Sequence, residues 1–271
     1  MSEKAQLSLD VTGENASAEY NAEHGIASVV AKDSAEAVAK AKELNTAPES
    51  FEEEPADCDC IVGSTVDGGS VYKLFDNYGK DAKVRLARLG GSVVGIVKTN
   101  GGVLSCPATT KIAKFVRFCD AFSLPILTFV DCKGFESIKS AAKAASAYAE
   151  ATTVKISVVY GQAVGSGYIA LAGTGANADM VYALPQAVIS PVNVEAAAFI
   201  LAADAMNVPV AEQKAVAEKF AAENLSAFNA AQNGYVDGIV EQQDLRKTLI
   251  SALDMLAGKR VPTVAKKHST I

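Results

Sequence analysis

The sequence predicts an α/β fold in which helices pack on a mostly parallel β-sheet. From residue 109 onward, amphipathic helical segments alternate with short apolar runs that are typical of buried strands. Before them, residues 84–99 contain two apolar runs joined by Gly90 and Gly91, which is the pattern of a β-hairpin. The chain has 271 residues, which is enough to bury a sizeable core.

The first 60 residues differ in composition from the rest of the chain. They hold fourteen Asp and Glu residues against four Lys, and we interpret this acidic segment as solvated surface. Residues 25–31 are expected to form a strand and residues 33–44 a helix, whereas residues 45–60, with two prolines and a charge run, are expected to be a linker. We therefore predict an N-terminal segment of residues 1–60, which carries a short strand and helix, and one domain of residues 61–271.

The elements of this domain follow from the spacing of its apolar residues. One face of residues 109–122 is apolar, which predicts a helix that begins at threonine caps. The last helix has a stripe of leucines at helical spacing and stops at Gly258. The full prediction is strands over 124–131, 154–160, 178–184 and 187–190, with helices over 109–122, 138–152, 193–206, 210–223 and 241–257.

Charge and hydropathy exclude two classes of partner. The formal net charge is −6, and the sequence contains no basic patch suited to nucleic acid. Polar residues interrupt the apolar runs before they reach the length that spans a bilayer, and the first residues lack a signal-peptide pattern. We therefore expect a cytoplasmic protein that does not insert into a membrane.

The five cysteines predict reduced thiols rather than a disulfide framework, because they are odd in number and scattered along the chain. Cys58 and Cys60 form a Cys-x-Cys pair, but no second pair of Cys or His residues lies near them in the sequence. We therefore expect no metal site.

The stretch AVGSGYIALAG, residues 163–173, places a Gly-Ser-Gly at the end of an apolar run. A serine nucleophile at this position would need a base such as histidine, and the chain has only His24 and His268. The G-x-S-x-G motif of serine hydrolases would also need a glycine where the chain has Val164. A Ser-His-Asp hydrolase is therefore not expected.

The same stretch has the G-x-G-x-x-A shape of a dinucleotide-binding loop, but its context differs. The expected strand ends near Tyr160, with four residues between it and Gly165, and no acidic residue follows about 20 positions later to bind a ribose. Two interpretations remain. The glycines could allow a helix to pack closely on a strand, or the backbone N–H groups of Ser166 and Gly167 could form an oxyanion hole at a helix start.

Similarity to a known family is carried by several blocks of the sequence. Residues 112–131, 147–171, 178–189 and 230–256 resemble the C-terminal half of the biotin-dependent acyl-CoA carboxyltransferases. The likeness extends back through residues 84–102. The resemblance implies a crotonase-like fold, which is a spiral of strand-strand-helix units, and this chain would be a single C-terminal half.

In this family the N-terminal half holds the acyl-CoA, a coenzyme A thioester, and the C-terminal half holds carboxybiotin. The resemblance therefore implies a carboxyltransferase subunit that moves a carboxyl group to or from a short acyl-CoA of the propionyl or methylmalonyl type. It also implies a partner chain that supplies the N-terminal half, a biotin carboxyl carrier protein, and a homo-oligomer that is a trimer or a hexamer.

The resemblance assigns residues of the Gly-Ser-Gly stretch to the site. Ser166 and Gly167 match the family's Gly-Ala pair, whose backbone N–H groups stabilise charge on the ureido oxygen of biotin. Biotin itself then removes the α-proton of the acyl-CoA, which agrees with the shortage of histidines. Gly165 and Tyr168, on either side of the pair, are assigned to cofactor binding.

Two other positions are matched in part. Gly134 and Phe135 fall in the family's Asp-x-Pro-Gly-Phe strand end that faces biotin, and Glu195 remains from a Gly-Pro-Glu-Gly-Ala motif that reads NVEAA here. The segment after Phe135 departs from the family, because it is shorter and lacks a Pro-Gly loop. This difference leaves two alternatives open: a structural subunit that has lost its chemistry, or a crotonase-type hydratase, isomerase or thioesterase that uses Glu195 as an acidic group.

Overall fold

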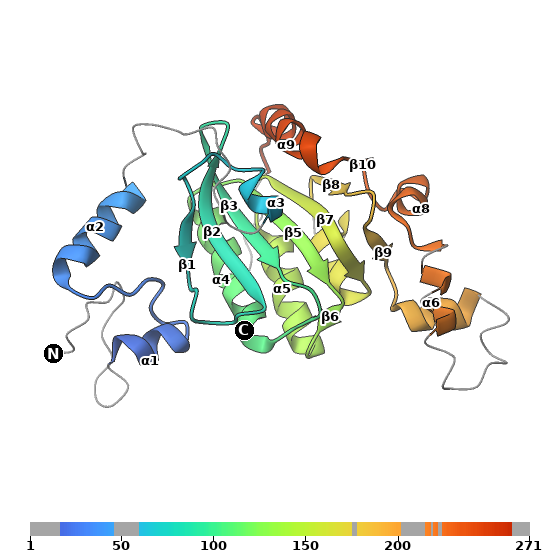
Figure 1. The fold of residues 1–271 in the computed structure, drawn as a ribbon, viewed down its shortest axis with the longest axis horizontal. Coiled ribbons are helices and arrows are strands. Elements are labelled where there is room, and N and C mark those ends of the chain that lie inside the picture. The colour runs from blue at the N-terminus through green and yellow to red at the C-terminus, as the bar shows by residue number, and fades with distance from the viewer. Residues whose placement is uncertain are drawn as a thin grey trace.

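An eight-stranded, mostly parallel sheet forms the centre of the computed structural model, which describes residues 17–45, 60–174, 178–201, 215–217, 219–221 and 224–261 (Figure 1). The strand order is β1-β2-β3-β5-β7-β8-β10, and β9 pairs with β7 beyond β8. The first two strands are antiparallel to their neighbours and the others pair in parallel. The strands are β1 (Tyr72–Leu74), β2 (Ala82–Leu89), β3 (Ser92–Thr99), β5 (Ile126–Cys132), β7 (Lys155–Val164), β8 (Met180–Ala183), β9 (Val188–Ser190) and β10 (Gly238–Ile239).

A separate two-stranded parallel sheet, β4 (Val103–Leu104) with β6 (Gly134–Phe135), extends the structure beyond the ends of β3 and β5. Helices lie on both faces of the large sheet and at its two ends (Figure 1). The described helices are α1 (Ala18–Glu23), α2 (Ser34–Asn45), α3 (Cys60–Gly63), α4 (Cys106–Ala121), α5 (Ile138–Glu150), the π-helix η2 (Tyr168–Ala172), α6 (Val194–Leu201), α8 (Ala227–Gln232) and α9 (Gln242–Leu256).

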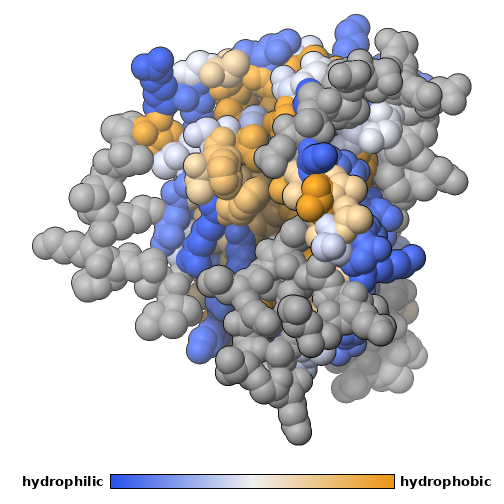
Figure 2. Space-filling view, turned by 90° about the vertical axis from the view of Figure 1, so that its left-hand side faces the viewer, coloured by the Kyte–Doolittle hydropathy of each residue, from blue (hydrophilic) through white to orange (hydrophobic). Residues whose placement is uncertain are grey.

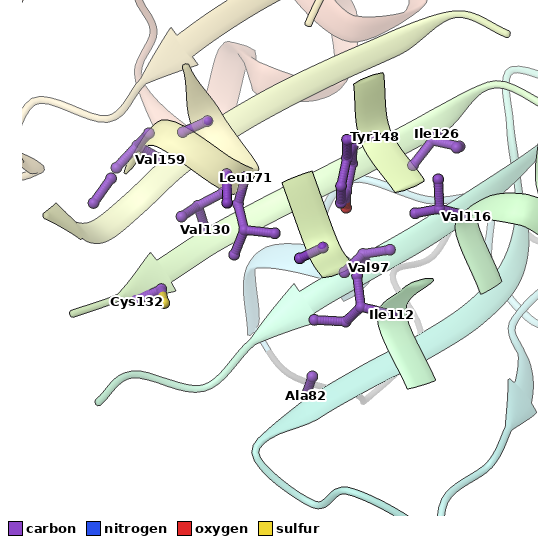
Figure 3. Close-up of a cluster of buried hydrophobic side chains, with 14 of the residues drawn as sticks. Ala82, Val97, Ile112, Val116, Ile126, Val130, Cys132, Tyr148, Val159 and Leu171 are labelled. Atoms are coloured by element: carbon purple, nitrogen blue, oxygen red, sulfur yellow. The ribbon is translucent and has the colours of Figure 1, made fainter. Parts of the chain in front are cut away.

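The main core lies between the sheet and the pair α4 and α5. Figure 3 shows Val97 of β3 beside Ile112 of α4, and Val130 of β5 beside Leu171 of the π-helix. The hydroxyl group of Tyr148, in the middle of this core, lies 2.9 Å from Thr128 Oγ1, so its polar atom has a partner. Alternate residues of the same strands point to the opposite face, where α3 and α9 bury a second cluster that contains Phe129.

The structure confirms most of the predicted elements of the domain. The hairpin at Gly90 and Gly91 joins β2 and β3, and the predicted strands and the last helix are present. The predicted helix over 109–122 begins three residues earlier than expected, because Ser105 rather than a threonine caps α4 by accepting the Ala108 N–H. The short helix α8 was not predicted, and most of the predicted helix 210–223 lies outside the described residues.

The predicted strand over 25–31 is wrong, although α2 is present as predicted. The segment is a loop in which Val30 makes an isolated bridge. The N–H groups of Ile26 and Ala27 both donate to the Asn21 carbonyl, at 2.8 and 2.9 Å, so the chain folds back on α1 instead of joining a sheet. Residues 1–16 and most of the predicted linker 45–60 lie outside the described residues.

This loop and α2 border a pocket of about 380 Å³ beside β1. Figure 2 looks onto this side of the molecule and shows hydrophobic surface bordered by hydrophilic surface. The pocket lining mixes apolar side chains, such as Val29 and Phe75, with the charged groups of Lys40 and Glu43. The pocket is lined by residues of the N-terminal segment and of β1. We therefore interpret it as the boundary where the N-terminal helices meet the sheet.

Candidate active site

Gly134, Phe135 and residues 165–168 meet at the carboxyl ends of β5 and β7, the sheet edge where α/β proteins bind ligands. Two chain segments form the site: residues 132–135 after β5, and residues 165–168 after β7. They are in close contact. A Cβ atom at Gly134 would lie 3.4 Å from Ser166 Oγ, and a Cβ atom at Gly167 would lie 2.7 Å from the Cys132 carbonyl oxygen.

Gly165 turns the chain from strand to helix. Its φ of +54° lies in the left-handed region that favours glycine. Its N–H donates to the Ser190 carbonyl at 2.8 Å, and its own carbonyl accepts the Ile169 N–H at 3.1 Å, which closes the first helical turn. The backbone at the start of α6 adjoins this turn, since a Cβ atom at Gly165 would lie 3.5 Å from Asn193 N.

Ser166 and Gly167 occupy the first helical positions after this turn. The first N–H groups of a helix have no carbonyl acceptor within the helix. Among the described residues, neither of these two N–H groups has an acceptor elsewhere. Ser166 is exposed, and Gly167 is buried against the end of β5. The geometry therefore offers backbone donors at this point, and it also requires a small residue at position 167.

Phe135 offers a third backbone donor near these two. The Glu136 N–H donates to the Leu104 carbonyl at 2.9 Å, on the side of β6 that pairs with β4. Because successive N–H groups along a strand point to opposite sides, the Phe135 N–H points away from β4. The Phe135 ring itself packs against the main core and anchors this segment.

Tyr168 and Glu195 occupy different positions from the backbone donors. The buried ring of Tyr168 lies 6.0 Å from that of Tyr235 in an edge-to-face pair, and its hydroxyl donates to the Tyr235 carbonyl at 2.9 Å. Burial raises the pKa of Tyr168, so the hydroxyl remains a neutral donor near neutral pH. Glu195 lies in α6, next to the site in the chain, but its side chain is outside the described residues.

The structure shows an apolar rim around the site that the sequence did not reveal. Val103 pairs with Gly134 across β4 and β6, Ile138 begins α5, Ile169 follows the Gly-Ser-Gly turn, and Val192 adjoins Gly165. Their side chains are between 43% and 89% exposed, with Ile138 the most exposed. Exposed apolar side chains grouped around a site are typical of a surface that contacts another molecule.

Asp131 is the Asp of the partly matched Asp-x-Pro-Gly-Phe segment, but its contact with β7 was not predicted: its carboxylate accepts the Gln162 N–H at 3.0 Å. The glycine at position 161 was the one sign of this contact in the sequence, because a Cβ atom there would lie 2.5 Å from the Asp131 carboxyl carbon.

The described residues contain no group of three His, Cys, Asp or Glu side chains arranged to hold a metal ion. None of the helices in the described ranges combines the length and apolar composition needed to cross a bilayer.

Three cysteines within the described residues differ in exposure. Cys106 is exposed at the start of α4, whereas Cys119 and Cys132 are buried. Burial raises the pKa of the Cys119 thiol to about 12 and that of the Cys132 thiol to about 11. Cys58 and the side chain of Cys60 lie outside the described residues.

We therefore predict that Cys106 reacts rapidly with a thiol reagent in the folded protein at pH 8, and that Cys119 and Cys132 do not. Reaction with an aromatic disulfide reagent, followed by absorbance, measures this. The Cys106→Ser variant should lose one rapidly reacting thiol, and Cys119→Ser should lose none. Equal losses in the two variants would contradict the assignment.

The α/β layers are those of a crotonase-like fold, as the similarity to a solved carboxyltransferase structure shows. The carboxyl transferase domain family matches residues 16–271, so the chain belongs to that family. The structure is similar to that of transcarboxylase 12S, a hexamer crystallised with hydrolysed methylmalonyl-coenzyme A, with a TM-score of 0.80 and 31% identity over 96% of this chain and 59% of that one.

Two curated relatives are similar in sequence. The methylmalonyl-CoA decarboxylase subunit alpha of Veillonella parvula is 35% identical over 230 residues, which cover 80% of this chain and 44% of the relative. The mitochondrial propionyl-CoA carboxylase beta chain of Homo sapiens is 36% identical over 224 residues, which cover 78% of this chain and 41% of the relative. The chain thus spans less than half the length of these relatives.

Proposed function

We propose that the chain is the carboxybiotin-binding half of a biotin-dependent acyl-CoA carboxyltransferase, and that it moves a carboxyl group to or from a propionyl-CoA or methylmalonyl-CoA type of substrate. The observation that carries the proposal is the pair of unpaired N–H groups of Ser166 and Gly167 at the sheet edge, beside Gly134. The names of the two curated relatives support this substrate class. A location in the cytoplasm stays a prediction.

The residues present fit the chemistry of this cofactor. Carboxybiotin, when bound, would supply the carboxyl group and the base that acts on the acyl-CoA. The N–H groups of Ser166 and Gly167 would donate to an oxygen that gains negative charge in the reaction, and the Phe135 N–H is available for the same task. Preorganised backbone donors of this kind contribute about 3 kcal/mol each to the stability of a transition state.

A second chain would complete the site. The curated relatives are more than twice as long as the matched segment, and the missing part would correspond to the half that holds acyl-CoA in the family. We assign the apolar rim of Val103, Ile138, Ile169 and Val192 to the contact with this second chain. A biotin carrier protein would deliver the cofactor, and a trimer or hexamer would be the assembled form, as the hexamer of transcarboxylase 12S suggests.

The test is to purify the chain alone and together with a chain that resembles the missing half. We expect decarboxylation of methylmalonyl-CoA or malonyl-CoA in the presence of free biotin only when both chains are present. Equal activity of the chain alone would contradict the two-chain proposal. Ile138→Asp in the rim should weaken the association about tenfold or more, whereas Met255→Asp, which changes another exposed apolar residue on α9, should not.

A structural subunit without chemistry is the second candidate. One observation favours it: β6 connects to α5 through Glu136 and Ser137 alone, where the family has a longer loop. Both residues are used in helix capping, because the Glu136 carboxylate accepts the Cys106 N–H at 2.9 Å and the Ser137 hydroxyl accepts the Ser140 N–H at 3.2 Å. A variant at Gly167 separates the two candidates, as argued below.

A further inference from the structure

Asp131 lies where three strand ends meet beneath the candidate site. Its side-chain Oδ1 accepts the Gln162 N–H of β7 at 3.0 Å. Its own N–H donates to Thr99 Oγ1 at the end of β3, at 2.7 Å, and its carbonyl accepts the Gly101 N–H at 2.9 Å. One residue of β5 is therefore bonded to the ends of both neighbouring strands.

The chain leaves room for this carboxylate on two sides. A Cβ atom at Gly161 would lie 2.5 Å from the Asp131 carboxyl carbon, which is closer than two carbon atoms can approach. A Cβ atom at Gly101 would lie 3.2 Å from Asp131 Oδ2. Each neighbour is a glycine, so the backbones of β7 and of the loop after β3 can close around the carboxylate.

The same residue coincides with an irregularity in the sheet. Val130 pairs with Val159, but Cys132 pairs with Ala163, so β7 contains two more residues than β5 across this step. The Asp131 carboxylate binds the N–H of Gln162 inside this bulge. The bulge sets which residue of β7 lies opposite Cys132, and Cys132 is the residue whose carbonyl contacts Gly167.

We propose that Asp131 is a positioning residue: by closing the bulge of β7, it holds the turn at residues 165–167 against the strand end at residues 132–135. The role rests on the acceptor oxygen rather than on the charge, because Asp131 makes no ion pair with any described residue. This inference rests on the proposed function only where kcat is measured, because that measurement needs carboxyltransferase activity.

The test compares Asp131→Ala with Asp131→Asn, which keeps an acceptor oxygen and removes the charge. In the assembled two-chain enzyme we expect Asp131→Ala to lower kcat about tenfold or more, with KM for the acyl-CoA within about twofold, since misplaced donors act on the reaction step. Asp131→Asn should stay within about threefold of the wild type. An equal loss in both variants, or an unchanged kcat in Asp131→Ala, would overturn the proposal.

Asp120 provides a matched control at the opposite edge of the sheet. Its Oδ1 also accepts backbone N–H groups, those of Thr152 at 2.6 Å and Thr153 at 3.0 Å, but it lies at the end of α4 away from the site. Asp120→Ala should lower the melting temperature and leave kcat unchanged. A fall in kcat equal to that of Asp131→Ala would show that general loss of structure explains both effects, and would overturn the positioning role.

Hydrogen exchange separates failure of this inference from failure of the proposed function. Measured by mass spectrometry on the chain alone, exchange across residues 161–170 should be about tenfold faster in Asp131→Ala than in the wild type, with Asp131→Asn close to the wild type. Gly161→Ala, which pushes a methyl group into the carboxylate, should behave like Asp131→Ala. Unchanged exchange would overturn the positioning role even in an active enzyme, and faster exchange would support it even if no carboxyl transfer is found.

Discussion

Gly167→Val is expected to abolish carboxyl transfer while the chain still folds and associates with its partner. A Cβ atom at position 167 would lie 2.7 Å from the Cys132 carbonyl oxygen and 3.0 Å from its sulfur, so the turn must move away from β5. The N–H groups of Ser166 and Gly167 then no longer point toward the oxygen that the proposed function assigns to them. Loss of such a donor lowers kcat about 100-fold to 1000-fold, whereas overpacking of this kind costs about 1–3 kcal/mol of stability.

The measurement is turnover of the assembled complex, with circular dichroism melting and gel filtration to verify folding and association. Gly258→Val is the matched control, because nothing lies within 4 Å of a Cβ atom at Gly258, and it should leave turnover unchanged. If Gly167→Val assembles with its partner and turnover is also unchanged, the chain is a structural subunit, and the catalytic assignment of the Gly-Ser-Gly turn fails.

The sequence predicted a strand-to-helix turn at residues 165–167 because such a turn is local. Gly165, Ser166 and Gly167 are adjacent in the sequence, and a strand-to-helix turn with free N–H groups is a property of a few neighbouring residues. The contact of this turn with Gly134 came from the family resemblance and not from spacing. Asp131 and Gly161 could not be paired from the sequence, because their contact depends on a bulge whose register forms only when β5 and β7 are side by side.

The errors in the fold prediction also arise from hydrogen bonds and packing contacts that the composition of a segment does not show. Residues 25–31 have the composition of a strand, but the backbone donors of Ile26 and Ala27 find the Asn21 carbonyl in the preceding turn. Helix α8 is six residues long, too short to show a helical period, and the capping hydroxyl of Ser226 together with its packing on β9 and β10 defines it. Long apolar elements such as α4 and β5 were predicted because the spacing of their buried apolar residues determines which secondary structure they form.

The buried carboxylate of Asp67 is a further contact that joins distant segments. It follows α3 and accepts the N–H groups of Gly90 at 3.0 Å and Gly91 at 2.8 Å, in the turn between β2 and β3. Arg246 of α9, 179 positions away in the chain, forms an ion pair with the same carboxylate and also donates to the Thr65 carbonyl at 2.7 Å. The Asp67 side chain thus links α9 to the hairpin of β2 and β3.

These contacts change the pKa of Asp67 in opposite directions. Burial raises the pKa, but the Gly91 N–H, the Arg246 guanidinium and the Gly90 N–H together outweigh it, so the pKa lies below its usual value of 3.8. A carboxyl group whose pKa is lower in the folded state stabilises the fold at pH values above its unfolded pKa. This contribution is lost as the pH falls below about 4 and through the folded pKa.

Asp67→Ala should lower the free energy of unfolding at pH 7 by about 1–3 kcal/mol, because it leaves two N–H groups and the half-buried Arg246 guanidinium without their acceptor. Urea denaturation measures this loss. Asp254→Ala, which removes an exposed carboxylate from the same helix α9, should change the stability by less than about 0.5 kcal/mol.

A double-mutant cycle with Arg246→Met tests whether the two side chains act as one unit. The loss in the double variant should be smaller than the sum of the single losses by about 1 kcal/mol or more, because the double variant removes both charges, whereas each single variant leaves one of them without its partner. The stability of the wild type should also fall more steeply than that of Asp67→Ala between pH 4 and pH 3. Additive losses, together with parallel pH curves, would mean that the hairpin and α9 are held together by the apolar cluster between them and not by Asp67.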